Sequence, residues 1–331
     1  MRFGRCSSAR FNADRILLML SFLFSATPLV HAQNGTPNVS QTVVADSDSN
    51  GLSSPGAVAV GTDENVFIAD TGNNRVLEEP WNSSTKAYGA QTVLVGNLLS
   101  PSSVAVSTSG NVFVADTGNN RIIEIPWNHT SGTYGTPTEV GSGFDSPHGV
   151  AVAAGGDVYI ADTGNNRVVE VPWDRAKQTY GAQTTVGTNL LRPAAVAVDS
   201  GGKIYIANLG NGSVVEVPAG CNAAKSCTSQ TTVASQENNG LANPTGVAVG
   251  QSGNLYIADT GNNRVILLPW NTSTNAYGAL KEIGSQLIGP EGVVLNSMGN
   301  VYIADTGNSR VIKIAQSNGP SRNRGGFRMR P

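Results

Sequence analysis

The chain has 331 residues, of which only 13% are charged, where soluble domains usually have about 25%. Its formal net charge of −2 argues against a strongly basic nucleic-acid binder, and the low content of charge argues against a disordered acidic chain. Aromatic residues make up 6%, so a large core must be built mainly from Val, Ile, Leu and Ala.

The first 32 residues have the pattern of a secretory signal peptide. Four arginines precede an apolar run at 16–24, and a small-x-small cleavage site ends at Ala32. A membrane anchor is the less favoured interpretation, because the run is too short to cross about 30 Å of hydrocarbon and Pro28 interrupts it. We therefore expect cleavage near Ala32 and a secreted protein, extracellular or periplasmic.

A short N-terminal lead (33–40) and a predicted strand (41–45) are followed by a sequence that resembles half of a calcium loop. In the pattern D-x-D-x-N-G, the oxygens of Asp46, Asp48 and Asn50 would be metal ligands. The final Glu of that motif is missing, since Ala57 occupies its position. An Asx-rich turn is therefore favoured over a calcium site, and no other cofactor is suggested.

One phrase then recurs six times along the chain. It reads VFIADTGNNRVLEEPW from Val66 and VYIADTGNNRVVEVPW from Val158, and it is altered to IYIANLGNGSVVEVP from Ile204. The residues at its Asp position are separated by 46, 46, 46, 51 and 46 residues: Asp70, Asp116, Asp162, Asn208, Asp259 and Asp305. An internal period of this length indicates a repeat architecture.

Each repeat contains four short runs suited to β-strands. In the second unit they lie at 104–106, 111–115, 122–125 and 138–140, with Gly, Asn, Ser and Pro between them. No stretch has the apolar period of 3.6 residues over the length of a helix. Four strands in a unit of about 40–50 residues are typical of a propeller blade.

The two ends of the repeat region predict a closed ring. The phrase QTVVA at 41–45 resembles the fourth-strand phrase QTVLV at 91–95, whereas the last unit ends after 311–314 without a fourth strand. The N-terminal strand can therefore complete the last blade and remove an open sheet edge. We predict an all-β fold over 41–315, a six-bladed β-propeller of four-stranded antiparallel blades.

The phrases P-x-G-V-A-V and G-N-V-Y-I-A-D-T-G-N-N-R-V resemble the NHL repeat, whose members form six-bladed β-propellers. The Asn-x-Arg after the Asp-Thr favours this family over the neighbouring YWTD propellers. The NHL family includes lyases, extracellular receptor domains and many interaction modules. The resemblance therefore implies an architecture more than it implies an activity.

The repeated Asp and the Arg five residues later flank a TGNN turn, and we interpret them as structural ion pairs. The unit that has Asn208 in place of Asp also has Ser213 in place of Arg, as expected if loss of one partner leaves the other unbalanced. A catalytic ring of carboxylates is the less favoured interpretation. The predicted pairs are Asp70–Arg75, Asp116–Arg121, Asp162–Arg167, Asp259–Arg264 and Asp305–Arg310.

Four units carry a Pro-Trp turn followed by a Tyr-Gly: these contain Trp81, Trp127, Trp173 and Trp270. An aromatic stripe could stack sugars, but packing against a neighbouring strand is favoured. The fourth unit has Cys221 and Cys227 instead, a spacing that predicts a local disulfide in an oxidising compartment. Residues 316–331 are predicted to be a disordered basic tail.

The loop that leads into the first strand of each unit, called here the lead-in loop, contains a proline, and the next residue should lie near the channel mouth. These next residues are Gly56, Ser102, His148, Ala194, Thr245 and Glu291. Only His148 and Glu291 are ionisable, and their units are opposite each other in a six-fold ring. The long lead-in loops at 46–54 and 235–243 carry Asp46, Asp48 and Glu237, which predicts an acidic sector on this face.

The composition of this face favours a binding module over an enzyme. A catalytic zinc usually needs three protein ligands, but only His129 and His148 follow the signal peptide, and His129 lies in a turn on the opposite face. The alternatives are a lyase- or lactonase-like enzyme that uses the same face and a structural envelope or matrix protein.

We therefore expect a secreted module that binds a protein, peptide or carbohydrate, with the acidic sector favouring a cationic partner. The expected ligand contacts are His148, Glu291, Thr245, Ser102 and Glu237. Neither a nucleic-acid partner nor a membrane-spanning segment is expected, and the chain is expected to be a monomer.

Overall fold

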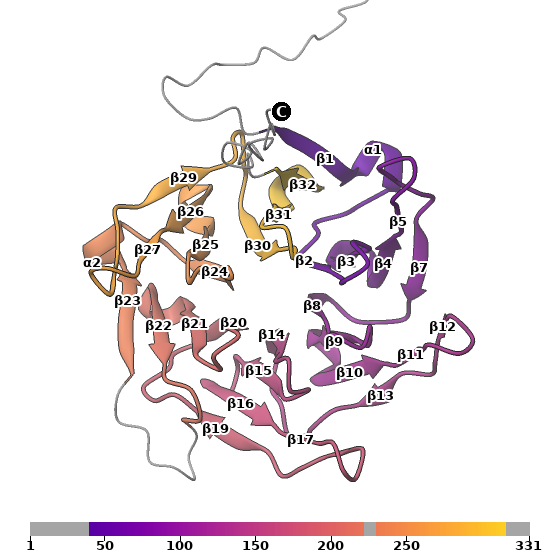
Figure 1. Ribbon diagram of the computed structural model, residues 1–331, viewed down its shortest axis with the longest axis horizontal. Helices are drawn as coiled ribbons and strands as arrows, with labels where there is room; N and C mark the ends of the chain where they lie inside the picture. The colour runs from indigo at the N-terminus through magenta and orange to yellow at the C-terminus, as the bar shows by residue number, and fades with distance from the viewer. Residues whose placement is uncertain (1–39, 222–229, 316–331) are drawn as a thin grey trace, which may run out of the picture. The chain divides into compact units, whose positions relative to one another are not determined.

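The computed structural model describes residues 40–221 and 230–315, which form six four-stranded antiparallel sheets and four two-stranded hairpins. The sheets are the blades of a propeller around a central channel (Figure 1), which confirms the predicted fold. The innermost strands of blades 1 to 6 are β2 (Ala57–Val60), β8 (Pro101–Val106), β14 (Pro147–Val152), β20 (Pro193–Val198), β24 (Pro244–Val249) and β30 (Pro290–Leu295).

The other three strands of each blade follow outward in chain order, except that the outermost strand of blade 6 is the N-terminal β1. The second strands are β3 (Val66–Asp70), β9 (Val112–Asp116), β15 (Val158–Asp162), β21 (Ile204–Asn208), β25 (Leu255–Asp259) and β31 (Val301–Asp305). The third strands are β4 (Arg75–Glu79), β10 (Arg121–Ile125), β16 (Arg167–Val171), β22 (Ser213–Val217), β26 (Arg264–Leu268) and β32 (Arg310–Ile314). The outermost strands are β7 (Thr92–Val95), β13 (Thr138–Glu139), β19 (Thr184–Val186), β23 (Thr231–Ser235), β29 (Lys281–Ile283) and β1 (Gln41–Asp46).

Strand β1 closes the ring as the outermost strand of blade 6. It pairs antiparallel with β32, from Gln41 opposite Ile314 to Asp46 opposite Arg310. Neighbouring innermost strands contact one another in order from β2 to β30, and β30 contacts β2. Blades 3 and 6 therefore lie opposite each other across the channel.

The hydrophobic core is divided among the spaces between blades. One cluster joins Phe67 and Val76 of blade 1 to Val112 and Ile123 of blade 2, and similar clusters fill other spaces. Because both faces of a blade are covered, its second strand is buried along its whole length, as in Val112–Asp116. Lateral packing between blades therefore holds the ring together.

Short hairpins follow the third strand in four blades, at the positions of the Pro-Trp turns. They are β5 (Trp81–Asn82) with β6 (Ala87–Tyr88), β11 (Trp127–Asn128) with β12 (Thr133–Tyr134), β17 (Trp173–Asp174) with β18 (Thr179–Tyr180), and β27 (Trp270–Asn271) with β28 (Ala276–Tyr277). Each tyrosine packs on the tryptophan of its own hairpin, with ring centroids 4.7–5.0 Å apart. Tyr180 also reaches blade 2, where its hydroxyl donates to Glu124 Oε2 at 3.0 Å. The tryptophans were expected to pack against a neighbouring strand; among the described residues each packs on the tyrosine of its own hairpin, and Tyr180 makes the contact to the neighbouring blade.

The two long lead-in loops contain short helical turns that the sequence pattern did not predict. They are α1 (Ser47–Asn50) and α2 (Gln236–Asn239), which begin after the N-caps Asp46 and Ser235. Each ends at a glycine with a left-handed backbone.

Several expectations concern residues outside the part of the chain that the structure describes. These are the signal peptide (1–32), most of the lead (33–39), Cys227 of the expected disulfide, and the basic tail (316–331). They stay predictions. Within the described residues, no helix is long and apolar enough to span a membrane.

Candidate functional site: the mouth of the central channel

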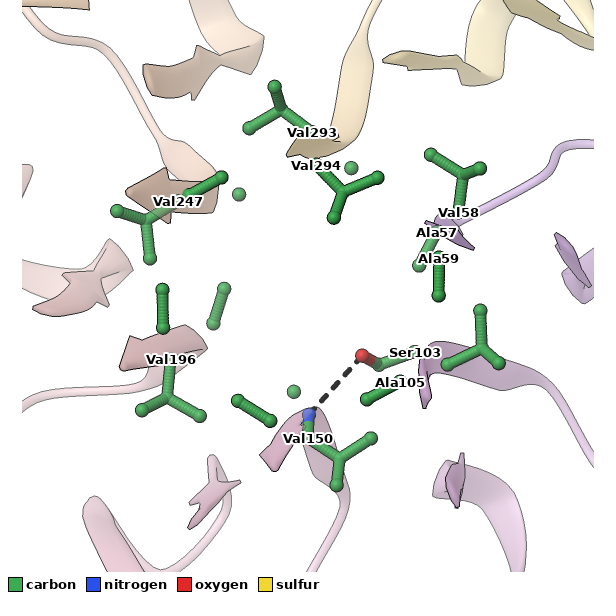
Figure 2. Close-up of a pocket in the computed structure, with 18 of the residues that line it drawn as sticks. Ala57, Val58, Ala59, Ser103, Ala105, Val150, Val196, Val247, Val293 and Val294 are labelled. Atoms are coloured by element: carbon green, nitrogen blue, oxygen red, sulfur yellow. Dashed lines mark hydrogen bonds between the residues drawn. The ribbon is translucent and has the colours of Figure 1, made fainter. Parts of the chain in front are cut away.

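The six innermost strands enclose a channel with a cavity of about 300 Å³ (Figure 2). Its wall is mainly aliphatic, because the innermost strands contribute Val and Ala side chains such as Ala57, Ala105 and Val294. The Ser103 hydroxyl on this wall accepts a hydrogen bond from the Val150 backbone at 3.2 Å, so it is engaged between blades 2 and 3. The wall alone therefore offers little polar chemistry to a ligand.

Polar groups gather at the lead-in end of the channel. All six residues that follow the lead-in prolines line the channel, as expected from the repeat: Gly56, Ser102, His148, Ala194, Thr245 and Glu291. His148 is the second residue of β14, and Glu291 is the second residue of β30. The two side chains therefore come from opposite blades. The mouth is therefore the one end of the channel that carries ionisable groups among its lining residues.

Ser102 and Thr245 help to place the two ionisable residues. Ser102 Oγ donates to the backbone oxygen of His148 at 2.7 Å, and Thr245 Oγ1 donates to that of Glu291 at 3.0 Å. Each hydroxyl also contacts the hydroxyl of the TGNN threonine in its own blade. These residues, expected as direct ligand contacts, therefore act first as supports for the strands beside them.

His148 is a half-buried imidazole at the mouth. Burial lowers its pKa, and the nearby charge of Arg192 acts in the same direction, while a hydrogen bond with the Ala194 backbone opposes them. The lowered pKa favours a neutral ring at pH 7. His148 therefore adds no positive charge that would repel a cation.

Glu291 is a half-buried carboxyl on the opposite side of the mouth, and burial raises its pKa. Its carboxylate has no ion-pair or hydrogen-bond partner within residues 40–221 and 230–315. Its backbone oxygen, by contrast, is held by Thr245. The mouth therefore presents one desolvated and unpaired acid on a fixed strand.

The five predicted Asp–Arg pairs are present as ion pairs with N–O distances of 2.6–2.8 Å and fully buried carboxylates. In blade 1, Asp70 Oδ1 also accepts from the Ser53 backbone at 2.8 Å, and Oδ2 accepts from Asn73 Nδ2 at 2.9 Å. Each carboxylate thus ties a lead-in loop to the turn between the second and third strands. These groups are absent from the channel lining, which favours a structural role over catalysis.

Asp46, Asp48 and Asn50 form a capped turn. Asp46 Oδ1 accepts from the Ser49 backbone at 2.7 Å, and Asn50 Oδ1 accepts from the Asp46 backbone at 3.2 Å. Among the described residues there is no group of three His, Cys, Asp or Glu that could hold a metal ion. The geometry is that of the favoured Asx-rich turn, and calcium binding stays an untested alternative.

Glu237 is exposed on α2, away from the channel lining. Both helical turns lie at the outer part of the ring (Figure 1), α1 against β1 and α2 against β23. The long loops fold against these outer strands because the caps close each turn locally. The acidic sector expected beside the mouth is therefore reduced to Glu291 at the mouth itself.

The threonine of each TGNN turn has a role that the sequence analysis missed. Its hydroxyl donates to the carbonyl of the lead-in proline in the next blade, which joins neighbouring blades on the lead-in face. The bonds are Thr71 to Pro101, Thr117 to Pro147, Thr163 to Pro193, Thr260 to Pro290, and Thr306 to Pro55, at 2.6–2.8 Å. The regular repetition of this threonine was the available signal.

The fold and the repeated junctions define a six-bladed β-propeller. The chain contains NHL repeats, since the family model described as "NHL repeat" matches residues 98–124, 144–170, 241–266 and 287–314. No curated protein matches the sequence.

Solved structures with this fold include proteins of several kinds. A gluconolactonase from Xanthomonas campestris has a TM-score of 0.62 and 13% identity, covering 83% of this chain and 89% of its own. A streptogramin B lyase has a TM-score of 0.58 and 14% identity, covering 84% and 97%. An auxiliary nutrient binding protein from Bacteroides thetaiotaomicron has a TM-score of 0.59 and 13% identity, covering 80% and 69%. At such identities the likeness shows the fold alone.

Proposed function

We propose that the protein is a secreted, non-catalytic binding module that holds a cationic ligand at the mouth of the central channel. The observation that carries this proposal is Glu291, the only acid among the described residues that line the channel. A buried carboxylate without a partner is unfavourable, and a bound ammonium or guanidinium group would supply the missing charge and hydrogen bonds. Secretion is proposed from the N-terminal sequence.

The surroundings of Glu291 suit the alkyl part of such a ligand. Below the mouth, the channel wall consists mainly of Val and Ala side chains, and the cavity of about 300 Å³ is at the lower end of the range for ligand sites. A Lys-like side chain has an apolar stem and a charged end, so it matches an aliphatic channel with an acid at its rim. A cationic peptide is therefore the ligand class that we favour.

A lyase- or lactonase-like activity is the second candidate, and His148 is the residue that favours it. A single imidazole at the mouth could act as a general base if a substrate placed its proton within hydrogen-bond reach. The solved lyase and gluconolactonase are similar to this chain in fold alone, and the nutrient binding protein has a similar fold. A binding site requires fewer functional side chains than an enzyme active site does.

The test is titration calorimetry with trilysine on the whole mature protein. We expect Glu291→Gln to weaken binding at least about tenfold, since this corresponds to a loss of only 1.4 kcal/mol. Glu237→Gln is the matched control, because it removes an equivalent charge at the outer part of the ring, and its affinity should equal that of the wild type. Absence of trilysine binding, or equal losses in both variants, would contradict the proposal.

The pH dependence provides a second check. Trilysine affinity should rise as the pH increases through the raised pKa of Glu291, because only the ionised carboxylate attracts the cation. Protonation of His148 at low pH places a positive charge on the same mouth and acts in the same direction. The Glu291→Gln variant should lose most of this dependence, and an unchanged pH profile in that variant would count against Glu291 as the contact.

A further inference from the structure

A second cavity lies between blades 2 and 3, with a volume of about 420 Å³. Its walls include the turns 107–109 and 153–156, which follow the innermost strands β8 and β14, and the hairpin residues Trp127 and Trp173. Because these turns come at the end of each innermost strand, the groove opens on the face opposite the lead-in loops. It is therefore separate from the mouth that holds His148 and Glu291.

The aromatic walls of this groove are rigid. The half-buried indole of Trp173 lies against Gly156, where an added Cβ would be 2.8 Å from Trp173 Cδ1. The Tyr180 ring packs edge-on against the same indole with ring centroids 4.8 Å apart, and the Tyr180 hydroxyl is fixed by Glu124 of blade 2. Trp127 is half-buried in the same way against the Tyr134 ring. Two indoles thus line one groove in positions set by the fold.

The basic residues of the groove distinguish it from the equivalent hairpins of other blades. The position two residues after the hairpin tryptophan is Ser83 in blade 1 and Thr272 in blade 5, but His129 in blade 2 and Arg175 in blade 3. Both His129 and Arg175 line the groove and are exposed. The departure from the repeat therefore places two basic side chains beside two indoles.

The Arg175 side chain is held in place by backbone carbonyls of the turn at 153–156. Its Nε donates to the Gly155 carbonyl at 3.1 Å and its Nη2 to the Ala154 carbonyl at 3.0 Å. Gln178 Nε2 donates to the Arg175 carbonyl at 2.6 Å, which fixes the hairpin loop. Glu124, the acid in this groove, already accepts from Asn111 and Tyr180 through its two oxygens. No carboxylate of the described residues pairs with Arg175, so the charge of the guanidinium is available.

We propose that this groove binds an oligosaccharide that carries a carboxylate group. Sugar rings present apolar C–H faces that stack on indoles, and their hydroxyls pair with polar side chains around the groove. The guanidinium of Arg175 provides the partner for the carboxylate, and His129 adds a second donor. The site is independent of the ligand proposed for the channel mouth.

The experiment is a titration of trigalacturonate followed by tryptophan fluorescence and calorimetry, with the neutral maltotriose as the comparison sugar. We expect trigalacturonate to bind and maltotriose to bind at least about tenfold more weakly. Arg175→Thr and His129→Ser install the residues that blades 5 and 1 carry at this position, and circular dichroism checks that both variants are folded. Arg175→Thr should weaken trigalacturonate binding at least about tenfold, and His129→Ser should weaken it less.

The matched control is Thr272→Ala, which changes the same loop position in blade 5 and should leave the affinity unchanged. Three outcomes would overturn the proposal: no trigalacturonate binding at millimolar concentration, equal binding of maltotriose, or wild-type affinity in the folded Arg175→Thr variant.

Discussion

Blades 3 and 4 perform the same structural task with different residues. In blade 3, the buried Asp162 accepts from the Asp145 backbone at 2.8 Å, from Asn165 at 2.9 Å and from Arg167 at 2.6 Å. In blade 4, Asn208 accepts from the Leu191 backbone at 2.7 Å, but Ser213 replaces the arginine. The acceptor that holds the lead-in loop is therefore kept, while the charge pair is lost as a whole.

The two blades also differ in how they contact the next blade. Blade 3 donates Thr163 Oγ1 to the Pro193 carbonyl at 2.7 Å, and its Asn166 accepts from the Arg192 backbone at 2.8 Å. Blade 4 has Leu209 and Gly212 at these positions, so neither side-chain bond can form. The blade 4–5 junction is held instead by the apolar cluster between the two blades and by contacts such as Lys203 over the Trp270 ring, so the threonine and asparagine bonds are not required at every junction.

The largest effect is expected from Asp116→Ala in blade 2, which has the blade 3 arrangement. The substitution removes the acceptor for the Leu99 backbone and leaves Arg121 without its main partner. Because breaking a buried pair leaves groups uncompensated, we expect a loss of about 3–5 kcal/mol in the free energy of unfolding, measured by urea denaturation. Trilysine affinity should be kept in the folded variant, and its loss there would point to a functional role for the pair.

Blade 1 offers a second departure from the repeat, at Glu79. The other five blades have Ile, Val or Leu at this position, and Glu79 is itself 1% exposed. Burial raises the pKa of Glu79 to about 7 from an ordinary value of 4.5, so the folded state binds an extra proton between these values. Wild-type stability should therefore fall as the pH rises from 5 to 8.

The variant Glu79→Ile should be more stable than the wild type at pH 8 by up to about 3 kcal/mol, with a much smaller gain at pH 5. The measurement is the urea midpoint at both pH values, and Glu237→Ile, at an exposed position with no ion pair among the described residues, is the control. An equal gain at both pH values would show that hydrophobic burial, and not the charge, is responsible.

A smaller effect is expected when blade 3 is converted toward blade 4. Asp162→Asn keeps the acceptor for the Asp145 backbone but leaves Arg167 unpaired, so we expect a loss of about 2 kcal/mol. Arg167→Ser should lower the free energy of unfolding less in the Asp162→Asn background than in the wild type. We expect a coupling energy of about 1 kcal/mol in this double-mutant cycle. Strictly additive losses would argue that the two residues were not lost in blade 4 as a pair.

The smallest effect is expected from restoring the missing threonine. Leu209→Thr places a hydroxyl where the other five blades donate to the next lead-in proline, here Pro244. A new hydrogen bond should raise the free energy of unfolding by about 0.5–1.5 kcal/mol relative to Leu209→Val, which has the same shape without the donor. Equal stability of the two variants would show that the blade 4–5 junction is set too far apart for this bond.

The sequence predicted the features that repeat, because repetition separates a structural requirement from chance. The six blades, the closing strand and the residues at the channel mouth all followed from spacing, and the joint replacement by Asn208 and Ser213 indicated the ion pairs. The groove at Trp127 and Trp173 did not follow, because it forms between two blades and depends on how their hairpins meet. Glu237 was expected beside the mouth but lies at the outer part of the ring, because the Ser235 cap turns its loop toward the outer strand. The spacing of the repeats contains no information about this local turn.

The closing strand also affects how the protein can fold during its synthesis. β1 is made first, yet its hydrogen-bonding partner β32 is made last, and Gln41 contacts Ser285 across a separation of 244 residues. A nascent polypeptide that folds from its N-terminus can assemble blades 1 to 5 while β1 still lacks a neighbour. The ribosome must therefore synthesise nearly the whole propeller before β1 can pair with β32. Until then β1 is an unpaired strand, and it is the part of the propeller most exposed to pairing with another polypeptide.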